Sequence, residues 1–338
     1  MTVRRSHPPS PASPADAPGA VEPAGHVPVL LDAVLATLAP RADAVYVDGT
    51  FGGGGYSEAV LTAARCRVFA IDRDPDAVRR GRALAERHGG RLSILEGRFG
   101  DMAGLLAPVN TDPIAGIALD LGVSSTQLDT AERGFSFRLD GPLDMRMSGE
   151  GQSAADLVAS LPEPQLAELI RAFGEERFAR RIARAIASAR QLRPIRRTTE
   201  LADIVRAAIP KSEPGQDPAT RTFQALRIAV NDELGELDRG LAAAEQLLAP
   251  GGRLALVSFH SLEDRRVKEF LRRRSDAAPR ASRHQPIRAG APTPSFKLLS
   301  RRAVKPSAAE IAHNPRARAA RLRAAERTAA PPWPPDTE

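Results

Sequence analysis

Short apolar runs alternate with amphipathic helical patterns in the first part of this 338-residue chain, and this alternation constrains the fold more than any other feature. Helical patterns extend from Tyr56 to Arg65 and from about Asp76 to His88. The apolar runs have the length of strands and cover Val45–Asp48, Arg67–Asp72, Leu92–Leu95 and Ile114–Leu121. Strands that alternate with helices form βαβ units with parallel pairing. The sequence therefore predicts an α/β fold built on a doubly wound, Rossmann-like sheet.

The alternation is interrupted once. From about Ala131 to Gly215 the chain shows several helical patterns and no convincing strand. A helix then resumes with Asp217 as N-cap and Pro218 in its first turn. It is followed by a helix around Leu237–Leu248, a buried strand at Arg253–Phe259 and candidate strands at Phe296–Ser300 and Arg321–Thr328. We therefore predict one sheet domain, residues 24–130 and 216–328, that carries an all-helical inserted domain over residues 131–215.

Composition separates the two ends from the folded part. Residues 1–23 contain six prolines without a hydrophobic period, and residues 329–338 carry a proline-rich run around Trp333. Both are predicted to be disordered tails, in which Trp333 is a stray aromatic or, alternatively, a docking residue. The polar stretch from Ser275 to Pro294 is predicted to form a long basic loop.

Several classes of protein are excluded by composition. Cys66 is the only cysteine, so a disulfide framework and a cysteine-rich zinc site are ruled out. The six histidines show no metal-ligand spacing, and we expect no metal. No apolar run approaches the ~18 residues of a membrane helix, and no secretory signal is evident. We therefore expect a cytoplasmic protein.

A glycine-rich loop, Asp48–Ser57, lies between the first strand and its helix. Glycines there let the backbone approach a ligand, and the helix N-terminus supplies oriented N–H groups. Asp72 ends the second strand, where a carboxylate suits hydrogen bonds to ribose hydroxyls. The loop departs from the G-x-G-x-x-G dinucleotide pattern. Asp48 would repel a pyrophosphate and attract a cation, which favours S-adenosylmethionine over a nicotinamide cofactor.

A third acid, Asp120, ends the fourth strand. In an open α/β sheet, ligands bind beyond the carboxyl ends of the strands. Asp48, Asp72 and Asp120 should therefore converge on one cleft, although each alone could serve as a helix cap or turn former.

The formal net charge is +7, and 44 of the 48 basic residues are arginines. Nine arginines and two glutamates lie between Arg171 and Arg197. There, Phe178, Ile182 and Ile186 make an apolar stripe with helical spacing. Arginines such as Arg180 and Arg184 occupy the remaining surface, as phosphate contacts or as a solvated face.

Two further sets of polar residues are candidates for the cleft. Arg227 and Asn231 fall near one face of the helix after Asp217, at the cleft mouth or in solvent. His260 follows the strand Arg253–Phe259 and could place a substrate base. Alternatively, Ser261 as N-cap and Asp264 at the third helical position would form a capping box, which would explain these residues without a role in catalysis or binding.

Seven motifs between residues 26 and 328 make the chain resemble the bacterial RsmH (MraW) methyltransferases. They are His26–Leu31, Asp48–Ser57, Asp120–Asp129, Arg133–Phe137, Gly141–Met147, Ser258–Arg265 and Asn314–Arg318. The resemblance implies a class I methyltransferase sheet. It implies methyl transfer from S-adenosylmethionine to the exocyclic N4 of cytosine 1402 in 16S rRNA, in the decoding centre. We expect the partner to be 16S rRNA within an assembled small ribosomal subunit.

The family's cofactor contacts carry over to Gly54, Gly55, Tyr56, Asp72, Phe99, Asp120 and Gln127. Many relatives have histidine where this chain has Tyr56. That exchange is harmless for a contact through the backbone N–H and harmful for a contact through the ring.

The amino nitrogen of cytosine is a poor nucleophile, and a nearby hydrogen-bond acceptor would help it to lose a proton. Amino-directed DNA methyltransferases use an Asn/Ser/Asp-Pro-Pro-aromatic motif, which this chain lacks. We hypothesise that Asp120 takes that role as the catalytic residue. The alternatives are a DNA amino-methyltransferase, which the missing motif disfavours, and a non-catalytic RNA-binding assembly factor, which Asp120 and the intact glycine loop disfavour.

Overall fold

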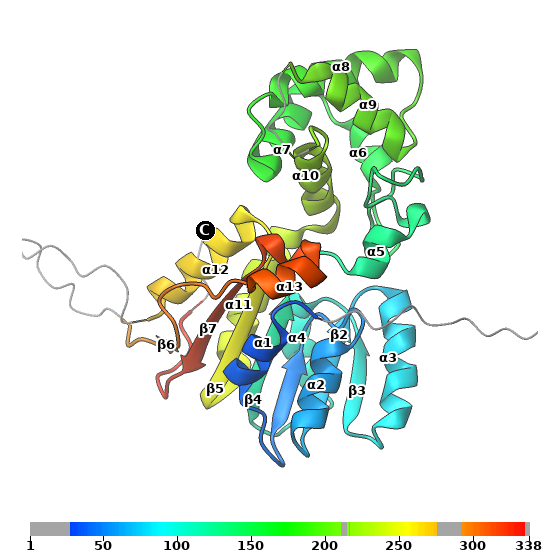
Figure 1. The fold of residues 1–338 in the computed structure, drawn as a ribbon. Coiled ribbons are helices and arrows are strands. Elements are labelled where there is room, and N and C mark those ends of the chain that lie inside the picture. The colour runs from blue at the N-terminus through cyan, green and yellow to red at the C-terminus, as the bar shows by residue number, and fades with distance from the viewer. Residues whose placement is uncertain (1–27, 211–214, 216, 276–291, 335–338) are drawn as a thin grey trace, which may run out of the picture.

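The computed structural model describes residues 28–210, 215, 217–275 and 292–334, so the predicted tail at residues 1–23 and most of the predicted basic loop lie outside the described residues. Its centre is a seven-stranded sheet with the order β3-β2-β1-β4-β5-β7-β6 (Figure 1). The strands are β1 (Val45–Asp48), β2 (Arg67–Asp72), β3 (Leu92–Glu96), β4 (Ile114–Asp120), β5 (Leu248–Ser258), β6 (Phe296–Leu298) and β7 (Arg321–Arg327).

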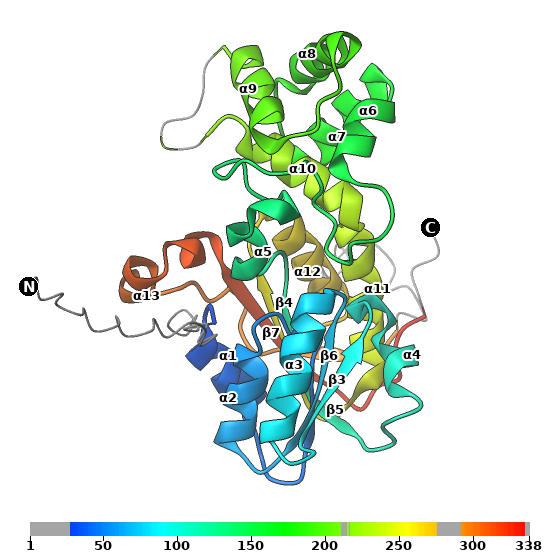
Figure 2. The same ribbon diagram turned by 90° about the vertical axis from the view of Figure 1, so that its right-hand side faces the viewer.

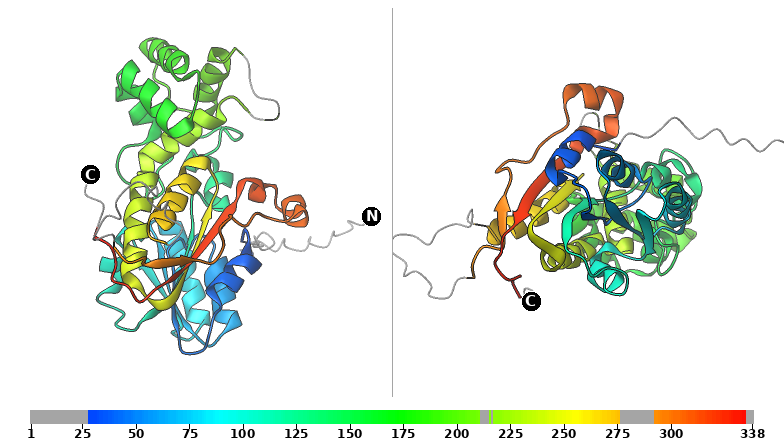
Figure 3. Two further views of the ribbon diagram at one scale, coloured as in Figure 1. Left: turned by 90° about the vertical axis from the view of Figure 1, so that its left-hand side faces the viewer. Right: turned by 90° about the horizontal axis from the view of Figure 1, so that it is seen from below.

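Strands β1 to β5 pair in parallel, and β7 runs antiparallel to both β5 and β6. Figure 3 (left) shows β7 in red beside β5, with the orange α13 (Ala308–His313) beyond its upper end. The Rossmann-like α/β prediction is confirmed, and this sheet is that of a class I methyltransferase.

Helices cover both faces of the sheet. One face packs against α1 (Leu31–Leu38), α2 (Gly55–Ala63) and α3 (Pro75–Arg87). The other packs against α4 (Met102–Leu106), α11 (Glu233–Leu247) and α12 (Ser261–Arg273). In β1, Val45 and Val47 enter one core and Tyr46 the other. Burial on both faces explains why the strands are continuous apolar runs rather than alternating ones.

A separate helical part stands above the sheet (Figures 1 and 2). It follows α5 (Ser125–Asp129) and comprises α6 (Ala154–Ser160), α7 (Glu163–Gly174), α8 (Ala179–Leu192), α9 (Thr198–Ala208) and α10 (Thr220–Asn231). Its own core contains the expected stripe of Ile182 and Ile186, with Phe178 packed against it. Phe223 and Leu226 of α10 join the same core, so the helical part continues past the predicted boundary at residue 215.

Two predicted helix starts are wrong. The carboxylate of Asp217 accepts the N–H of Ala219 at 2.8 Å and pairs with Arg206, so it caps a turn, and α10 begins later, at Thr220. At α12 the capping box uses His260 and Glu263 instead of Ser261 and Asp264. There the imidazole serves as the N-cap acceptor.

The end of the described chain is also more ordered than predicted. The indole N–H of Trp333 donates to the carbonyl of Thr293 at 2.9 Å, and its backbone N–H donates to Glu245 at 3.1 Å. The ring lies beside the guanidinium of Arg274, which pairs with Glu245. This buried ion pair supplies the acceptor that anchors the tail. No helix in the described part of the chain is long and apolar enough to cross a membrane.

Candidate functional site

Three acids lie at the carboxyl ends of neighbouring strands, as predicted. Asp48 ends β1, Asp72 ends β2 and Asp120 ends β4. These strands are adjacent in the sheet and parallel, so their ends share one edge. The structure therefore brings the three carboxylates to a single edge beneath the helical part.

The glycine loop connects these acids to one another. Thr50 donates its backbone N–H to Asp48 at 3.2 Å, and its hydroxyl oxygen accepts the backbone N–H of Asp120 at 2.6 Å. Gly52 donates its N–H to Asp72 at 2.7 Å. The hydroxyl of Ser57, in the first turn of α2, donates to Asp48 at 2.7 Å. The loop is thus fixed to all three strand ends by its own polar groups.

Burial gives the site an unusual charge state. Burial, with a smaller contribution from Asp72, raises the pKa of Asp48 to about 6. The pKa of Asp72 is raised by burial, and that of Asp120 is raised well above its usual value by burial, by Asp48 and by Glu263. Oδ1 of Asp120 is buried without a hydrogen-bond partner. Among the described residues no ion pair joins any of the three acids, so a positively charged ligand fits this edge.

Glycine is required at two positions of the loop. Gly54 has φ +84°, and a Cβ there would lie 2.7 Å from the ring of Phe51. A Cβ on Gly55 would lie 2.0 Å from Pro28. The loop therefore begins α2 with backbone packed closely on both sides, and α2 has no side-chain cap over its first N–H groups.

Tyr56 is buried, and its hydroxyl donates to the carbonyl of Val29. Burial, with a contribution from Asp120, raises the pKa of this phenol. The ring therefore holds the segment before α1, which leaves the backbone N–H of Tyr56 as the group available to a cofactor. This arrangement favours a cofactor contact through the backbone N–H, for which the exchange of histidine for tyrosine is harmless.

The other two residues expected at the cofactor, Phe99 and Gln127, both contact neighbouring parts of the protein. The ring of Phe99 packs where a Cβ on Gly240 would lie, at 2.5 Å. The amide of Gln127 donates to Asp74 at 2.7 Å and accepts the N–H of Ser124 at 3.0 Å. Gln127 is therefore engaged within the protein, where it holds the N-cap residue of α3.

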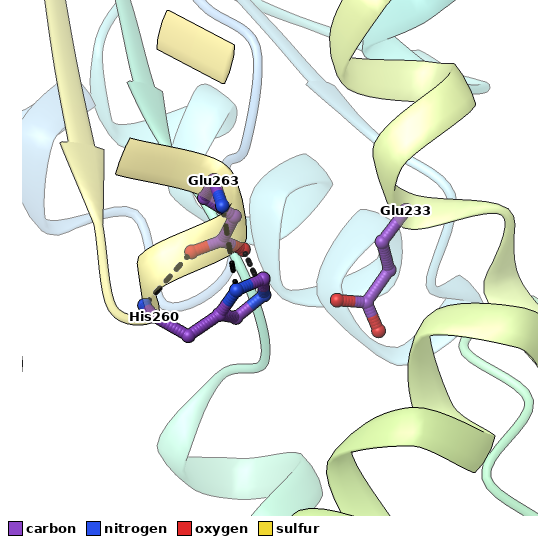
Figure 4. Close-up of side chains that lie close together, drawn as sticks. All are labelled: Glu233, His260 and Glu263. Carbon is purple, nitrogen blue, oxygen red and sulfur yellow. Dashed lines mark hydrogen bonds and ion pairs between the residues drawn. The ribbon is translucent and has the colours of Figure 1, made fainter. Parts of the chain in front are cut away.

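A second polar cluster lies at the same edge, where β5 meets α12 (Figure 4). Nδ1 of His260 accepts the N–H of Glu263 at 3.4 Å, which leaves Nε2 as the ring nitrogen that carries a hydrogen. Nε2 is buried and lies 3.1 Å from Oε1 of Glu263, and it makes no hydrogen bond within the described part of the chain. The other oxygen of Glu263 accepts the N–H of Phe259 at 2.9 Å.

The cluster is completed by Glu233 and Arg227, which form a two-pronged ion pair with distances of 2.8 and 3.0 Å. Ligand atoms of Glu233, His260 and Glu263 all lie within 4.8 Å of one another. Both oxygens of Glu233 are already bound to the guanidinium, so a metal ion would have to displace it. We assign the Arg227–Glu233 ion pair and the His260–Glu263 capping box to structural roles.

Two residues expected at the cleft mouth are engaged inside the protein. Arg227 is held by Glu233, and Asn231 is 3% exposed. Asn231 donates to the carbonyl of Met145 at 2.7 Å and accepts the N–H of Met147 at 2.9 Å. Met145 has φ +65°, so Asn231 supports a strained loop.

The arginines of α8 lie far from the acids, because α8 is at the end of the helical part away from the sheet (Figure 1). Arg180 and Arg184 are both exposed, and Arg184 lies 3.6 Å from Glu163.

Two features of the site were not predicted from the sequence. One is Thr50, which hydrogen-bonds to two of the acids, and the other is the proximity of Glu263 to Asp120. The available signal is the position of Thr50 in the glycine loop, two residues after Asp48.

Sequence comparisons with known proteins point to one family. A sequence model described as the MraW methylase family matches residues 23–328. A protein of Paramagnetospirillum magneticum named ribosomal RNA small subunit methyltransferase H is 62% identical, covering 93% of this chain and 99% of its own length. One of the same name from Rhodospirillum centenum is 64% identical, covering 93% and 96%. Among solved structures, an rRNA methylase from Streptococcus thermophilus is 11% identical, with a TM-score of 0.35 over 88% of this chain and 93% of its own.

Proposed function

This chain belongs to the MraW methylase family, and from that premise we propose that it methylates the exocyclic N4 of a cytosine in small-subunit rRNA, by resemblance cytosine 1402 of 16S rRNA. Its methyl donor is S-adenosylmethionine. The observation that carries the proposal is the buried, unpartnered Oδ1 of Asp120 beside the glycine loop. The relatives named above support small-subunit rRNA as the substrate.

The residues present fit the cofactor. When bound, S-adenosylmethionine supplies a methyl group on a positively charged sulfur together with a positively charged amino group. Asp48 and Asp120 are buried acids without an ion-pair partner among the described residues, and they can balance positive charge there. Asp72, fixed by Gly52 and Asp74, is the acid that would accept ribose hydroxyls.

In the proposed mechanism Asp120 acts on the target base. Burial raises the pKa of Asp120 in the free protein, and the positive charge of bound S-adenosylmethionine would favour its ionised form. Oδ1 of that carboxylate would accept a hydrogen bond from the N4 amino group and leave the nitrogen lone pair available for attack. S-adenosylmethionine would supply the methyl group there, and Oδ1 of Asp120 would take the proton that the amino nitrogen loses on methylation. A carboxylate with a raised pKa is a better proton acceptor than an ordinary one, so the burial of Asp120 favours this step.

Other groups would position the RNA. His260 presents an Nε2–H at the end of β5, next to the strand that carries Asp120, and we propose that it helps to place the base. Because Nε2 is buried in this structure, the base reaches it only if neighbouring groups move. We propose that Arg180 and Arg184 on α8 contact phosphates away from the reacting base.

The test is mass spectrometry of nucleosides from digested 16S rRNA of cells with and without this protein. We expect N4-methylcytidine to disappear on deletion and to return with the wild type but not with Asp72→Ala. An unchanged N4-methylcytidine signal would overturn the assignment and favour the non-catalytic assembly factor. N4-methylcytosine lost from DNA instead would favour the DNA amino-methyltransferase.

A further inference from the structure

The segment from Leu299 to Arg321 contains six basic residues and a single acid, Glu310. We propose that this segment, the C-terminal basic segment, binds the phosphates of the rRNA strand that carries the target base. The inference rests on the proposed function and adds a second RNA contact beside the reacting site, separate from the arginines of α8.

Strand register places this segment at the edge where the acids lie. Leu298 of β6 pairs with Ala325, and the chain then continues so that Val304 pairs with Leu322. Arg321, where β7 begins, pairs with Ser258 at the carboxyl end of β5. Leu299 donates its N–H to Ala324 at 3.1 Å, so the segment first runs along β7 and then, from Val304 onward, lies at the carboxyl edge of the sheet.

Two contacts bring the segment to the border of the cofactor site. Glu310 of α13 accepts the N–H of Leu30 at 2.6 Å, and Leu30 follows the residue that receives the Tyr56 hydroxyl. Arg316 pairs with Asp129 of α5, next to the loop that follows Asp120. Figure 2 shows α13 at about the height of α5, to the side of it and above α1.

Most of the positive charge of the segment is uncompensated. Arg316 is held by Asp129 and Arg321 by Asp264. The remaining cations are exposed and take part in no ion pair within the described part of the chain, and they are Arg301, Arg302, Lys305 and Arg318. The one acid, Glu310, faces inward to Leu30. The unpaired cations are therefore available to phosphates. Lysine binds a phosphate as a single charge, and arginine can bind it through two parallel hydrogen bonds.

RNA fits this surface better than an acidic protein does. The segment borders the site where the base must enter, so the strand on either side of that base passes over it. The segment offers Arg and Lys without an exposed aromatic side chain, which suits backbone contacts rather than base stacking. We expect it to position the strand and leave base selection to the cleft.

The experiment compares two full-length charge-reversal variants, both loaded with S-adenosylmethionine and assayed on unmethylated small subunits. The first is Arg301→Glu/Arg302→Glu/Lys305→Glu. The matched control is Arg41→Glu/Arg65→Glu/Arg87→Glu, which makes the same charge change with exposed arginines near the amino ends of β1, β2 and β3. Cofactor affinity and the thermal midpoint of each variant check folding.

For the first variant we expect KM for the subunit to rise at least tenfold, with kcat and cofactor affinity within twofold of wild type. The slope of log affinity against log salt should fall by about 2, because each lost single-strand phosphate contact removes roughly 0.7. The control should stay within threefold of wild type. Equal KM values for the two variants would overturn this inference while leaving the proposed function standing, whereas a wild type that methylates no subunit would overturn the proposed function itself.

Discussion

The hydroxyl oxygen of Thr50 accepts the backbone N–H of Asp120 at 2.6 Å, so the loop after β1 and the end of β4 are fixed to each other. Thr50 also donates its own N–H to Asp48. One residue therefore sets the spacing between the acid that would face the cofactor and the acid that would face the base. A displacement reaction depends on that alignment.

Asp120→Asn keeps the shape of the side chain and removes the ability of Oδ1 to accept a proton. If Asp120 is the acceptor for the amino proton, kcat should fall by about 10² to 10⁴. Cofactor affinity, measured by calorimetry, should change by less than tenfold. A variant that turns over at the wild-type rate would remove Asp120 from the mechanism.

The affinity for S-adenosylmethionine should fall as the pH is lowered through about 6, where Asp48 takes up a proton in the free protein. The cofactor is positively charged and favours the ionised acid, so each pH unit below this pKa should cost up to about tenfold in affinity. Asp48→Asn should bind more weakly and lose this part of the pH dependence. Titrations between pH 5 and 8 would show it.

The same acid should destabilise the free protein near neutral pH. The pKa of Asp48 is higher in the folded chain than in the unfolded one, so the folded state binds more protons between about pH 4 and pH 6. The contribution of Asp48 to stability is therefore greatest at low pH and is lost as the pH rises through this window. Thermal midpoints of wild type and Asp48→Asn should diverge there, and parallel curves would contradict this account.

Asn231→Ala should destabilise the protein by about 2–4 kcal/mol, because it leaves the buried carbonyl of Met145 and the N–H of Met147 without a partner. Urea unfolding of the free protein measures this directly. The result separates an internal role from a substrate contact. Normal stability with weakened rRNA binding would return Asn231 to the substrate-binding residues.

Arg180→Glu with Arg184→Glu should weaken binding to small subunits without a change in cofactor affinity, because both side chains are exposed on α8. Filter binding at several salt concentrations is the measurement. The salt dependence should become shallower as phosphate contacts are lost. Binding that equals the wild type at every salt concentration would identify these arginines as a solvated face.

The sequence predicted what depends on local pattern. The strands that end in Asp48, Asp72 and Asp120 and the loop between β1 and α2 follow from short apolar runs and glycine positions, and parallel pairing then places the acids together. Contacts between segments that are far apart in the chain could not be predicted from local sequence pattern. Asn231 is spaced like a surface residue, yet it binds a loop more than eighty residues earlier in the chain.

Two predictions that relied on local residue types differ from the structure. Ser261 is a better N-cap type than His260, but the imidazole accepts the N–H of Glu263 and takes the position. Trp333 sits in a proline-rich tail with no periodicity, and only the buried pair of Arg274 and Glu245 explains why it is anchored. Both cases depend on partners that a single stretch of sequence does not contain.

The most direct test of the central claim is methyl transfer from labelled S-adenosylmethionine by the purified protein to small subunits that lack the modification, followed by nucleoside analysis of the RNA. The account predicts that the label appears in N4-methylcytidine from 16S rRNA. It also predicts that Asp120→Asn, with cofactor still bound, leaves almost none. Label in a different nucleoside, or equal labelling by the Asp120 variant, would contradict it.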